Sequence, residues 1–261
     1  MNIFIKHLIR AWFLALAVTT SAQAQTAQGH IKTANGQILA AITNSPLEKD
    51  PRVQANGKIW RLERADITDA SLPRVLLVGD SILNGYLNRV AKSLQGKANV
   101  DAWVNPYYHS QMFNNRLAEV LTNGSYAIVH INAGLHGWQP GRIPPGQYEP
   151  LSRALIDVIR QQCPKAKIIW ANTTPIMLKG QPSRLDPELN PIIVEQNQTA
   201  AKVMAEMQVP VNDFYAVATN HLALAKGDGF HWNAPAYELY AIITTDSILR
   251  ELNLRAPLQH E

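Results

Sequence analysis

The sequence predicts an α/β protein of three layers, in which a central, mostly parallel five-stranded sheet lies between two layers of helices. Two observations carry this prediction. Short apolar segments with β character alternate with segments of helical period, a pattern typical of parallel strands joined by helical crossovers. The strand segments are apolar at consecutive rather than alternate positions, which indicates a sheet covered on both faces.

The expected elements follow one another along most of the chain. The strands are expected at 74–79, 99–104, 126–132, 167–172 and 209–211. The helices are expected at 82–95, 111–122, 148–162, 192–207 and 234–252. The last helix follows Asn233, a candidate N-cap, and has Pro235 in its first turn, where proline is favourable. Before the first strand, residues 58–62 are expected to form a short helix or strand outside the main fold.

The first 24 residues have the features of a secretory signal peptide. A basic start with Lys6 and Arg10 precedes an apolar run over 11–18 and a small-x-small cleavage site at Ala22-Gln-Ala24. The apolar run is too short to span a bilayer convincingly. We therefore expect a secreted or periplasmic protein that is mature from about Gln25.

The remainder is expected to comprise a lead-in segment over 25–70 and one domain over 71–261. The formal net charge of +4 falls to +2 without the leader, since 22 basic residues then face 20 acidic ones. The sequence has no run of Lys or Arg, so no nucleic-acid partner is expected. No later segment has the length and apolarity of a membrane span, so no membrane association is expected after cleavage. The single cysteine, Cys163, is predicted to be a half-buried structural thiol.

Ser81 follows Gly79-Asp80 at the predicted junction between the first strand and its helix. Ligands of such sheets bind at the carboxyl ends of the strands. The first turn of a helix also offers N–H groups and partial positive charge, which can stabilise an anion that forms beside a hydroxyl. Ser81 is therefore a candidate nucleophile. The alternative is that it only caps the helix.

A candidate base lies just before the last helix, where Asp228 and His231 are three residues apart in a loop. The carboxylate can orient the imidazole, whose other ring nitrogen then accepts the serine proton. This pair is a sharper signal than a lone Asp or His, which is usually only solvated. Asn132 and His136 follow the third strand and could donate hydrogen bonds to an oxyanion. Alternatively, they belong to a turn whose polar side chains cap backbone groups.

Two of these segments together resemble the SGNH/GDSL hydrolase family. Gly79-Asp-Ser-Ile82 is similar to its first block and Asp228-Gly-Phe-His231 to its last block. The resemblance spans about 74–252 and implies a flavodoxin-like fold and serine esterase chemistry without a metal or other cofactor. It also implies that Ser81 is the nucleophile, His231 the base and Asp228 its acidic partner.

The middle blocks depart from the family pattern. The third block of the family is Gly-x-Asn-Asp, and its Asn donates to the oxyanion. Here Gly134-Leu-His-Gly137 places His136 at that position, with Asn132 as the second candidate. The second block normally supplies a glycine N–H, but residues 103–110 contain no glycine. Asn105 or a neighbouring backbone amide is expected to serve instead.

Trp138 and Trp232 adjoin the expected catalytic residues, and aromatic rings of this kind stack on sugars. Each tryptophan of an α/β domain is nevertheless more often part of the core. Residues 172–175 and 209–213 are also similar to segments of secreted family members that act on carbohydrate esters. We therefore expect a carbohydrate O-acetylesterase whose substrate is a polysaccharide or small-molecule ester.

Three other functions remain open. The first is a lipase or lysophospholipase, which would need a long apolar channel for the acyl chain. The second is a metal-dependent hydrolase, in which Asp80, His130 and His136 would converge with Asp228 and His231, although no familiar ligand spacing supports it. The third is a catalytically weak or inactive relative that only binds carbohydrate, an alternative suggested by the altered second and third blocks.

Overall fold

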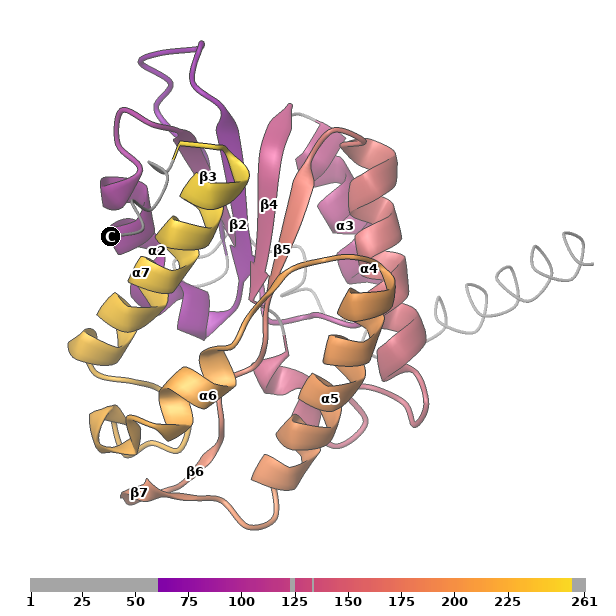
Figure 1. Cartoon of the computed structure of the whole chain (residues 1–261). Coiled ribbons are helices and arrows are strands. Elements are labelled where there is room, and N and C mark those ends of the chain that lie inside the picture. The colour runs from indigo at the N-terminus through magenta and orange to yellow at the C-terminus, as the bar shows by residue number, and fades with distance from the viewer. Residues whose placement is uncertain (1–60, 123–124, 133, 255–261) are drawn as a thin grey trace, which may run out of the picture. The chain divides into compact units, whose positions relative to one another are not determined.

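The computed structural model describes residues 61–122, 125–132 and 134–254, in which strands and helices alternate (Figure 1). The strands are β1 (Arg61–Glu63), β2 (Arg74–Gly79), β3 (Asn99–Val104), β4 (Tyr126–Asn132), β5 (Lys167–Ala171), β6 (Met177–Leu178), β7 (Gln181–Leu185) and β8 (Val211–Asn212). The helices are α2 (Ser81–Ser93), α3 (Gln111–Thr122), α4 (Tyr148–Gln162), α5 (Asn190–Glu206), α6 (Phe214–Thr219) and α7 (Ala234–Glu251), with 3₁₀ turns η3 (Leu135–Trp138) and η4 (Leu222–Leu224). Every expected strand and helix from residue 74 onward is present within two residues of its predicted bounds.

The main sheet has the strand order β1-β3-β2-β4-β5-β8. All neighbouring pairs from β3 to β8 are parallel, whereas β1 pairs antiparallel with β3. Without β1, the order is the one of flavodoxin-like sheets, in which the second strand lies outside the first. The predicted fold class is thus confirmed.

Two details of the prediction are wrong. The sheet has six strands rather than five, because Arg61–Glu63 pairs with the edge strand β3. For the same reason this part of the segment 58–62 belongs to the main fold and does not lie outside it. Residues 58–60, the leader at 1–24 and most of the lead-in at 25–70 lie outside the described residues.

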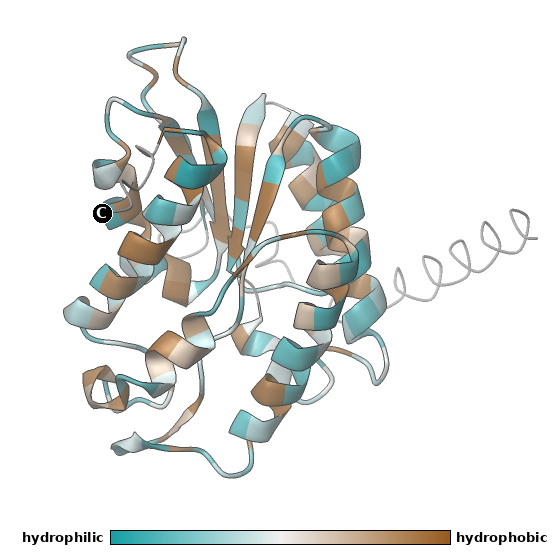
Figure 2. Cartoon of the chain, in the orientation of Figure 1, coloured by the Kyte–Doolittle hydropathy of each residue, from teal (hydrophilic) through white to brown (hydrophobic). Residues whose placement is uncertain are grey.

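Helices cover both faces of the sheet. On one face, α2 and α7 lie side by side, and on the other α3, α4 and α5 form a continuous layer (Figure 1). Successive residues of β2 point alternately into the two cores: Val75 and Leu77 into the first, Leu76 and Val78 into the second. Burial on both faces explains why the strand sequences are continuously apolar. Figure 2 shows the same pattern, with mostly hydrophobic central strands and helices that alternate between hydrophobic and hydrophilic positions.

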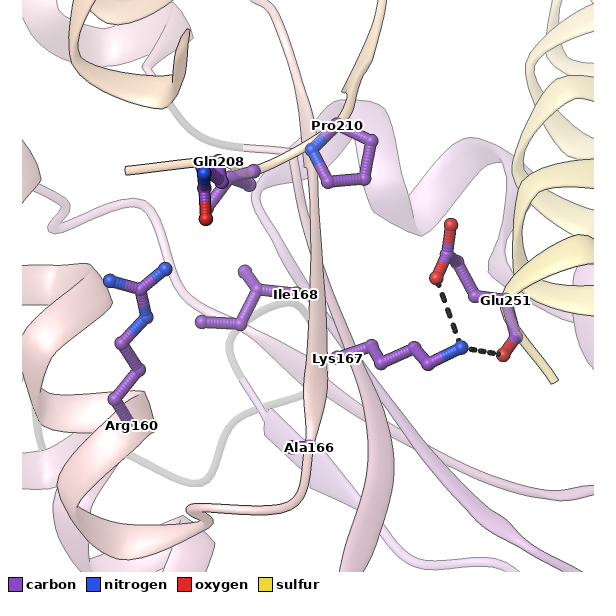
Figure 3. A pocket seen from close by; sticks show the side chains of 8 residues that line it. Arg160, Ala166, Lys167, Ile168, Gln208, Pro210 and Glu251 are labelled. Atoms are coloured by element: carbon purple, nitrogen blue, oxygen red, sulfur yellow. Dashed lines mark hydrogen bonds and ion pairs between the residues drawn. The ribbon is translucent and has the colours of Figure 1, made fainter. Parts of the chain in front are cut away.

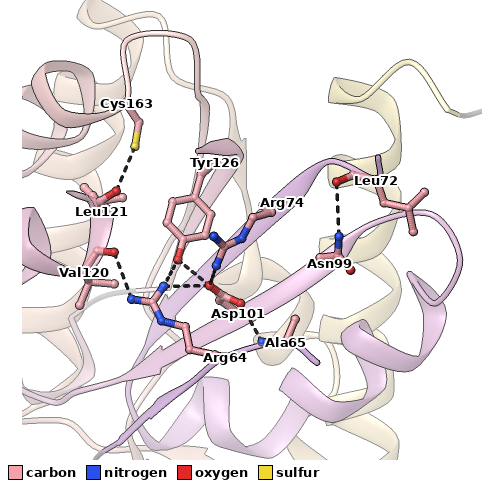
Figure 4. A network of polar contacts seen from close by, with 10 residues as sticks. All are labelled: Arg64, Ala65, Leu72, Arg74, Asn99, Asp101, Val120, Leu121, Tyr126 and Cys163. Carbon is pink, nitrogen blue, oxygen red and sulfur yellow. Dashed lines mark hydrogen bonds and ion pairs between the residues drawn. The ribbon is translucent and has the colours of Figure 1, made fainter. Parts of the chain in front are cut away.

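A polar network stabilises the amino end of the sheet around the fully buried carboxylate of Asp101 on β3 (Figure 4). Its Oδ2 accepts hydrogen bonds from Arg64 at 2.9 Å, Arg74 at 2.5 Å and the Tyr126 hydroxyl at 2.6 Å. Its Oδ1 accepts from the backbone amide of Ala65 at 2.8 Å. Burial opposes ionisation, but these donors outweigh it and lower the pKa of Asp101. The network ties the chain after β1 to the start of three strands.

The end of α7 is joined to the start of β5 at a pocket of about 220 Å³ (Figure 3). Lys167 Nζ donates to the backbone carbonyl of Glu251 at 2.6 Å and lies 3.3 Å from its carboxylate. A cation at a helix C-terminus satisfies a carbonyl that the helix itself leaves without a donor. This pocket lies at the amino end of β5, at the opposite edge of the sheet from Ser81.

Two further features bear on the predictions. Cys163 follows the last residue of α4 and is more buried than expected, with a side chain in the second core.

Among the described residues, no helix combines the length and apolarity needed to cross a membrane.

Candidate active site

Ser81 is the first residue of α2, directly after the carboxyl end of β2. The helix can begin this close to the strand because residue 79 is glycine: a Cβ there would lie 2.2 Å from the Cβ of Leu83. The N-cap of α2 is Asp80, whose Oδ1 accepts from the amide of Ile82 at 2.8 Å. Ser81 therefore does not cap the helix, and its hydroxyl is left for another partner.

That partner is His231. Its Nε2 lies 3.0 Å from Ser81 Oγ, and its Nδ1 lies 2.8 Å from Asp228 Oδ2. The carboxylate at Nδ1 favours the tautomer with the proton on that nitrogen, so that Nε2 can accept the serine proton. The side chains of His231 and Asp228 are 37% and 42% exposed, so the relay is open to a substrate.

The carboxylate of Asp228 is stabilised in its ionised form. Burial works against ionisation, but Oδ1 accepts from the amides of His231 at 2.8 Å and Phe230 at 2.9 Å. Together with the imidazole at Oδ2, these bonds lower the pKa of Asp228 to about 2. Asp228 is therefore a permanent anion at neutral pH, as the orienting member of such a relay must be.

Backbone hydrogen bonds fix the loop that carries this pair. The amides of Met177 and Gly180, in the β6–β7 hairpin, donate to the carbonyls of Gly229 and Gly227 at 2.9 Å each. These two bonds flank Asp228. Farther out, the Lys226 amide donates to the His231 carbonyl at 2.8 Å and closes the loop. This hairpin was not predicted from the sequence.

Trp232 anchors the same loop to the hydrophobic core. Its side chain is only 2% exposed and packs edge-on against Tyr240 of α7, with ring centroids 6.2 Å apart. The prediction that Trp232 contacts substrate is therefore wrong, because its ring belongs to the core. Trp138 in η3 is half-buried instead and stacks on Phe230, with ring planes 8° apart and centroids 5.7 Å apart.

His136 lies in η3, close enough to Asp80 and His231 for their charges to influence it. Burial lowers the pKa of His136, and Asp80 opposes this effect. Burial thus favours the neutral imidazole, which carries one N–H donor. Asp80 joins this turn to the Ser81 helix, since its carboxylate accepts from the backbone amides of both Ile82 and Leu135. Burial raises the pKa of Asp80. The link that Asp80 makes between η3 and α2 was not foreseen from the sequence.

The two asparagine candidates differ in their surroundings. The Nδ2 of Asn132 is directed at β5, where the carbonyls of Ala171 and Asn172 lie 3.4 and 3.3 Å away. Asn105 lies beside the end of β2, because its amide donates to the Gly79 carbonyl at 2.7 Å. Its Oδ1 accepts from the Tyr107 amide at 2.8 Å. The Asn132 amide is thus engaged at the end of β5, whereas His136 and Asn105 stay candidates for the oxyanion donors.

The five residues considered as metal ligands do not all converge. His130 lies within β4, fully buried, with Nε2 3.2 Å from the side-chain amide of Asn212. Burial lowers the pKa of His130 to about 3, so it is a neutral core residue. Within the described part of the chain, no group of three or more His, Cys, Asp or Glu side chains is arranged to hold a metal ion.

The structure thus brings a serine, a histidine and an aspartate into contact at the carboxyl edge of a flavodoxin-like sheet. The model of the GDSL-like lipase/acylhydrolase family matches residues 77–239, which include Ser81, Asp228 and His231. The chain belongs to this family and is a carboxylic ester hydrolase.

Solved structures with the same fold support this assignment at the level of the fold. A Bacteroides fragilis protein described as an acylhydrolase is 19% identical, with a TM-score of 0.56 over 81% of this chain and 100% of its own. The acetylxylan esterase Axe2 of Geobacillus stearothermophilus is 16% identical, with a TM-score of 0.55 over 70% and 95%. A GDSL-like lipase of Bacteroides thetaiotaomicron is 16% identical, with a TM-score of 0.54 over 68% and 88%. No curated protein sequence matches the chain.

Proposed function

We propose that the chain is a secreted serine esterase that removes O-acetyl groups from carbohydrate. Ser81 is its nucleophile, His231 its general base and Asp228 the residue that orients the base. The observation that carries the proposal is the continuous relay from Ser81 Oγ through both nitrogens of His231 to Asp228, with distances of 3.0 and 2.8 Å. Such contacts are the geometric requirement for activating a serine hydroxyl.

The reaction proceeds in two halves. His231 Nε2 takes the proton of Ser81 as Oγ bonds to the acetyl carbon, and the carbonyl electrons move onto the oxygen. The Ser81 amide at the start of α2 and the His136 N–H stabilise this oxyanion. Collapse of the intermediate breaks the ester bond, and the leaving sugar oxygen takes the proton from His231. Water then repeats the sequence on the acetyl-enzyme, which releases acetate and restores Ser81.

The preference for carbohydrate rests on the aromatic pair beside the relay. Trp138 and Phe230 are both half-buried and stack on each other next to His231. Neither residue is fully buried, and aromatic surfaces suit the C–H faces of sugars. The acetylxylan esterase among the structures of similar fold agrees with this choice of substrate class.

The test compares three esters with the purified mature protein: acetylated xylan, 4-nitrophenyl acetate and a 4-nitrophenyl ester of a long-chain acid. Acetate release from the first two, together with fluorophosphonate labelling that is lost in Ser81→Ala, is the expected result. Preference for the long-chain ester would replace the proposal with a lipase. Sugar binding without labelling or hydrolysis would indicate an inactive binding relative, and loss of activity to a chelator would indicate a metal-dependent hydrolase.

Secretion is tested separately. The leader at 1–24 is expected to be removed during export, so the exported protein should begin near Gln25. Sequencing of its N-terminus checks the cleavage site. Retention of the full chain inside the cell would contradict this part of the proposal.

A further inference from the structure

A hollow of about 310 Å³ lies beside the aromatic pair, between the loop 139–147 and helix α5. Trp138 belongs to both places: it lines the hollow and stacks on Phe230, which directly precedes His231. The Trp138 ring thus lies between the hollow and the loop that carries His231. A ligand in it could be part of the same molecule as an ester at Ser81.

The loop that forms one wall of the hollow is constrained by two hydrogen-bonded turns. It consists of two turns, closed by the bonds from the Arg142 amide to Gln139 and from the Gln147 amide to Pro144, each at 3.0 Å. Each turn has proline at its second position and glycine at its third, and these glycines, Gly141 and Gly146, have φ of 73° and 74°. This is the sequence and geometry of a type II turn, which leaves the unfolded loop few other conformations.

A buried arginine holds the two turns against the body of the protein. Arg142 is 8% exposed, donates to the carbonyl of Pro106 at 2.7 Å and lies 4.1 Å from the ring centroid of Tyr107. Burying a guanidinium is costly unless the charge has partners. Here the Pro106 carbonyl and the face of the Tyr107 ring are its partners. The result is a wall whose shape is fixed before any ligand arrives, which lowers the entropic cost of binding.

The opposite wall is helix α5, which presents mostly polar side chains to the hollow. It contributes Glu195, Gln196 and Thr199 besides the apolar Ile192. Gln196 also fixes η3, since its Nε2 donates to the Gly137 carbonyl at 3.1 Å. A ligand between these walls meets hydrogen-bonding groups on one side and Trp138 with prolines on the other. An acyl chain there would desolvate the Glu195 carboxylate without compensation. A sugar unit has both hydroxyls and an apolar face, and so fits both walls.

We propose that this hollow binds a sugar unit of the glycan next to the acetylated one. The inference rests on the proposed function, because it extends the carbohydrate site away from Ser81. It identifies the substrate as an oligosaccharide or polysaccharide rather than an acetylated monosaccharide. The volume is at the lower end of the range for small-ligand sites, which suits one sugar unit.

The test measures binding of unacetylated sugars, so that it does not depend on ester hydrolysis. Calorimetry on the full mature protein with xylo-, cello- and chito-oligosaccharides of one to four units should show that affinity rises with length for at least one series. Thr199→Trp, which fills the hollow, should weaken the binding of that oligosaccharide by about tenfold or more. Glu195→Trp, at an exposed position of the same wall, should do the same without a risk to folding.

The matched control is Ala201→Trp, an exposed position on the side of α5 turned away from the hollow, about 200° around the helix from Thr199. It should keep the affinity of the wild-type protein. Affinity independent of length in every series, or equal loss in all three variants, would overturn the inference. Hydrolysis of aryl acetate by a protein that binds no oligosaccharide would overturn only the proposal that the hollow binds a sugar unit. Length-dependent binding without hydrolysis would overturn only the esterase proposal.

Discussion

The rings of Trp138 and Phe230 lie with their planes 8° apart, and this contact joins the turn that carries His136 to the loop that carries His231. The two residues are far apart in the sequence and belong to the two segments that carry His136 and His231. Their stacking therefore couples the oxyanion side of the site to its acid–base side.

A double-mutant cycle measures this coupling. Trp138→Ala, Phe230→Ala and the double variant should show an interaction energy of about 0.5–1.5 kcal/mol in the free energy of unfolding, because both single changes remove the same contact. Urea unfolding of the four proteins gives the value. Strict additivity of the two single changes would show that the rings do not stabilise each other.

Asp228→Asn should lower kcat for ester hydrolysis by about 10⁴-fold, since an amide at Nδ1 no longer fixes the tautomer that leaves Nε2 ready to accept a proton. Asp228→Glu keeps the charge and should retain more activity. The pH profile offers a second check. The pKa of Asp228 is about 2, so lowering the pH from 7 to 4 should not protonate it, and any loss of activity over this range must come from another group. An Asp228→Asn enzyme with wild-type kcat would remove Asp228 from the mechanism.

His136→Ala should lower kcat by about 10²–10³-fold with little change in KM, because a donor to the oxyanion acts only in the transition state. His136→Gln retains an N–H and should recover part of the loss. The same measurements on Asn132→Ala provide a comparison, since Asn132 directs its amide at β5. A larger kcat effect for Asn132→Ala than for His136→Ala would reverse the assignment of the donor.

Gly229→Ala should reduce kcat by up to about 10²-fold, because it displaces the loop that holds Asp228 and His231. Gly229 has φ of 96°, and a Cβ there would lie 3.1 Å from the Met177 carbonyl. Gly96→Ala is the matched control: its φ is 70°, but no atom lies within 4 Å of the added Cβ. Both changes should destabilise the fold through backbone strain, and only the first should affect turnover. Activity assays alongside thermal unfolding separate the two effects.

Asp101→Asn should cost about 3–5 kcal/mol of folding free energy at pH 7, because two arginines then face a buried neutral group. The pKa of Asp101 is lowered in the folded protein, so its contribution is fully present above the unfolded value of about 3.9 and is lost as the pH falls through the folded value. The difference between variant and wild type should therefore shrink as the pH falls below the unfolded value of about 3.9.

Urea unfolding at pH 7 and pH 3 measures this change. Glu119→Gln removes an exposed ion pair with Arg116 and should cost less than about 1 kcal/mol at either pH. An Asp101→Asn effect that is small at pH 7, or one that grows toward acid pH, would contradict the role given to the network.

Most of the fold could be predicted because its determinants are local. The run from Val75 to Val78 is apolar on both faces, and the residues around Ser81 mark the end of a strand and the start of a helix. The pairing of β1 with the main sheet and the β6–β7 hairpin were not foreseen, since a strand of three residues or a hairpin of uneven strands shows no hydrophobic period. Their structure comes from pairing with partners distant in the sequence.

The proposed site shows the same division. Ser81, Asp228 and His231 could be chosen because each has chemistry that needs the others. The role of Trp232 could not, because a tryptophan beside a catalytic residue can point toward the substrate or into the core with the same local sequence. Its 2% exposure results from the packing of α7, which no local pattern encodes. The tie that Asp80 makes to Leu135 likewise depends on how two loops meet.

The β6–β7 hairpin holds the acid–base loop through hydrogen bonds between peptide groups, from Met177 to Gly229 and from Gly180 to Gly227. Main-chain bonds do not depend on side-chain identity. The outward-facing residues of the hairpin, such as Lys179 and Gln181, can therefore change without moving Asp228. This part of the surface is thus free to diverge among related enzymes and to acquire new contacts while the chemistry beneath it stays the same.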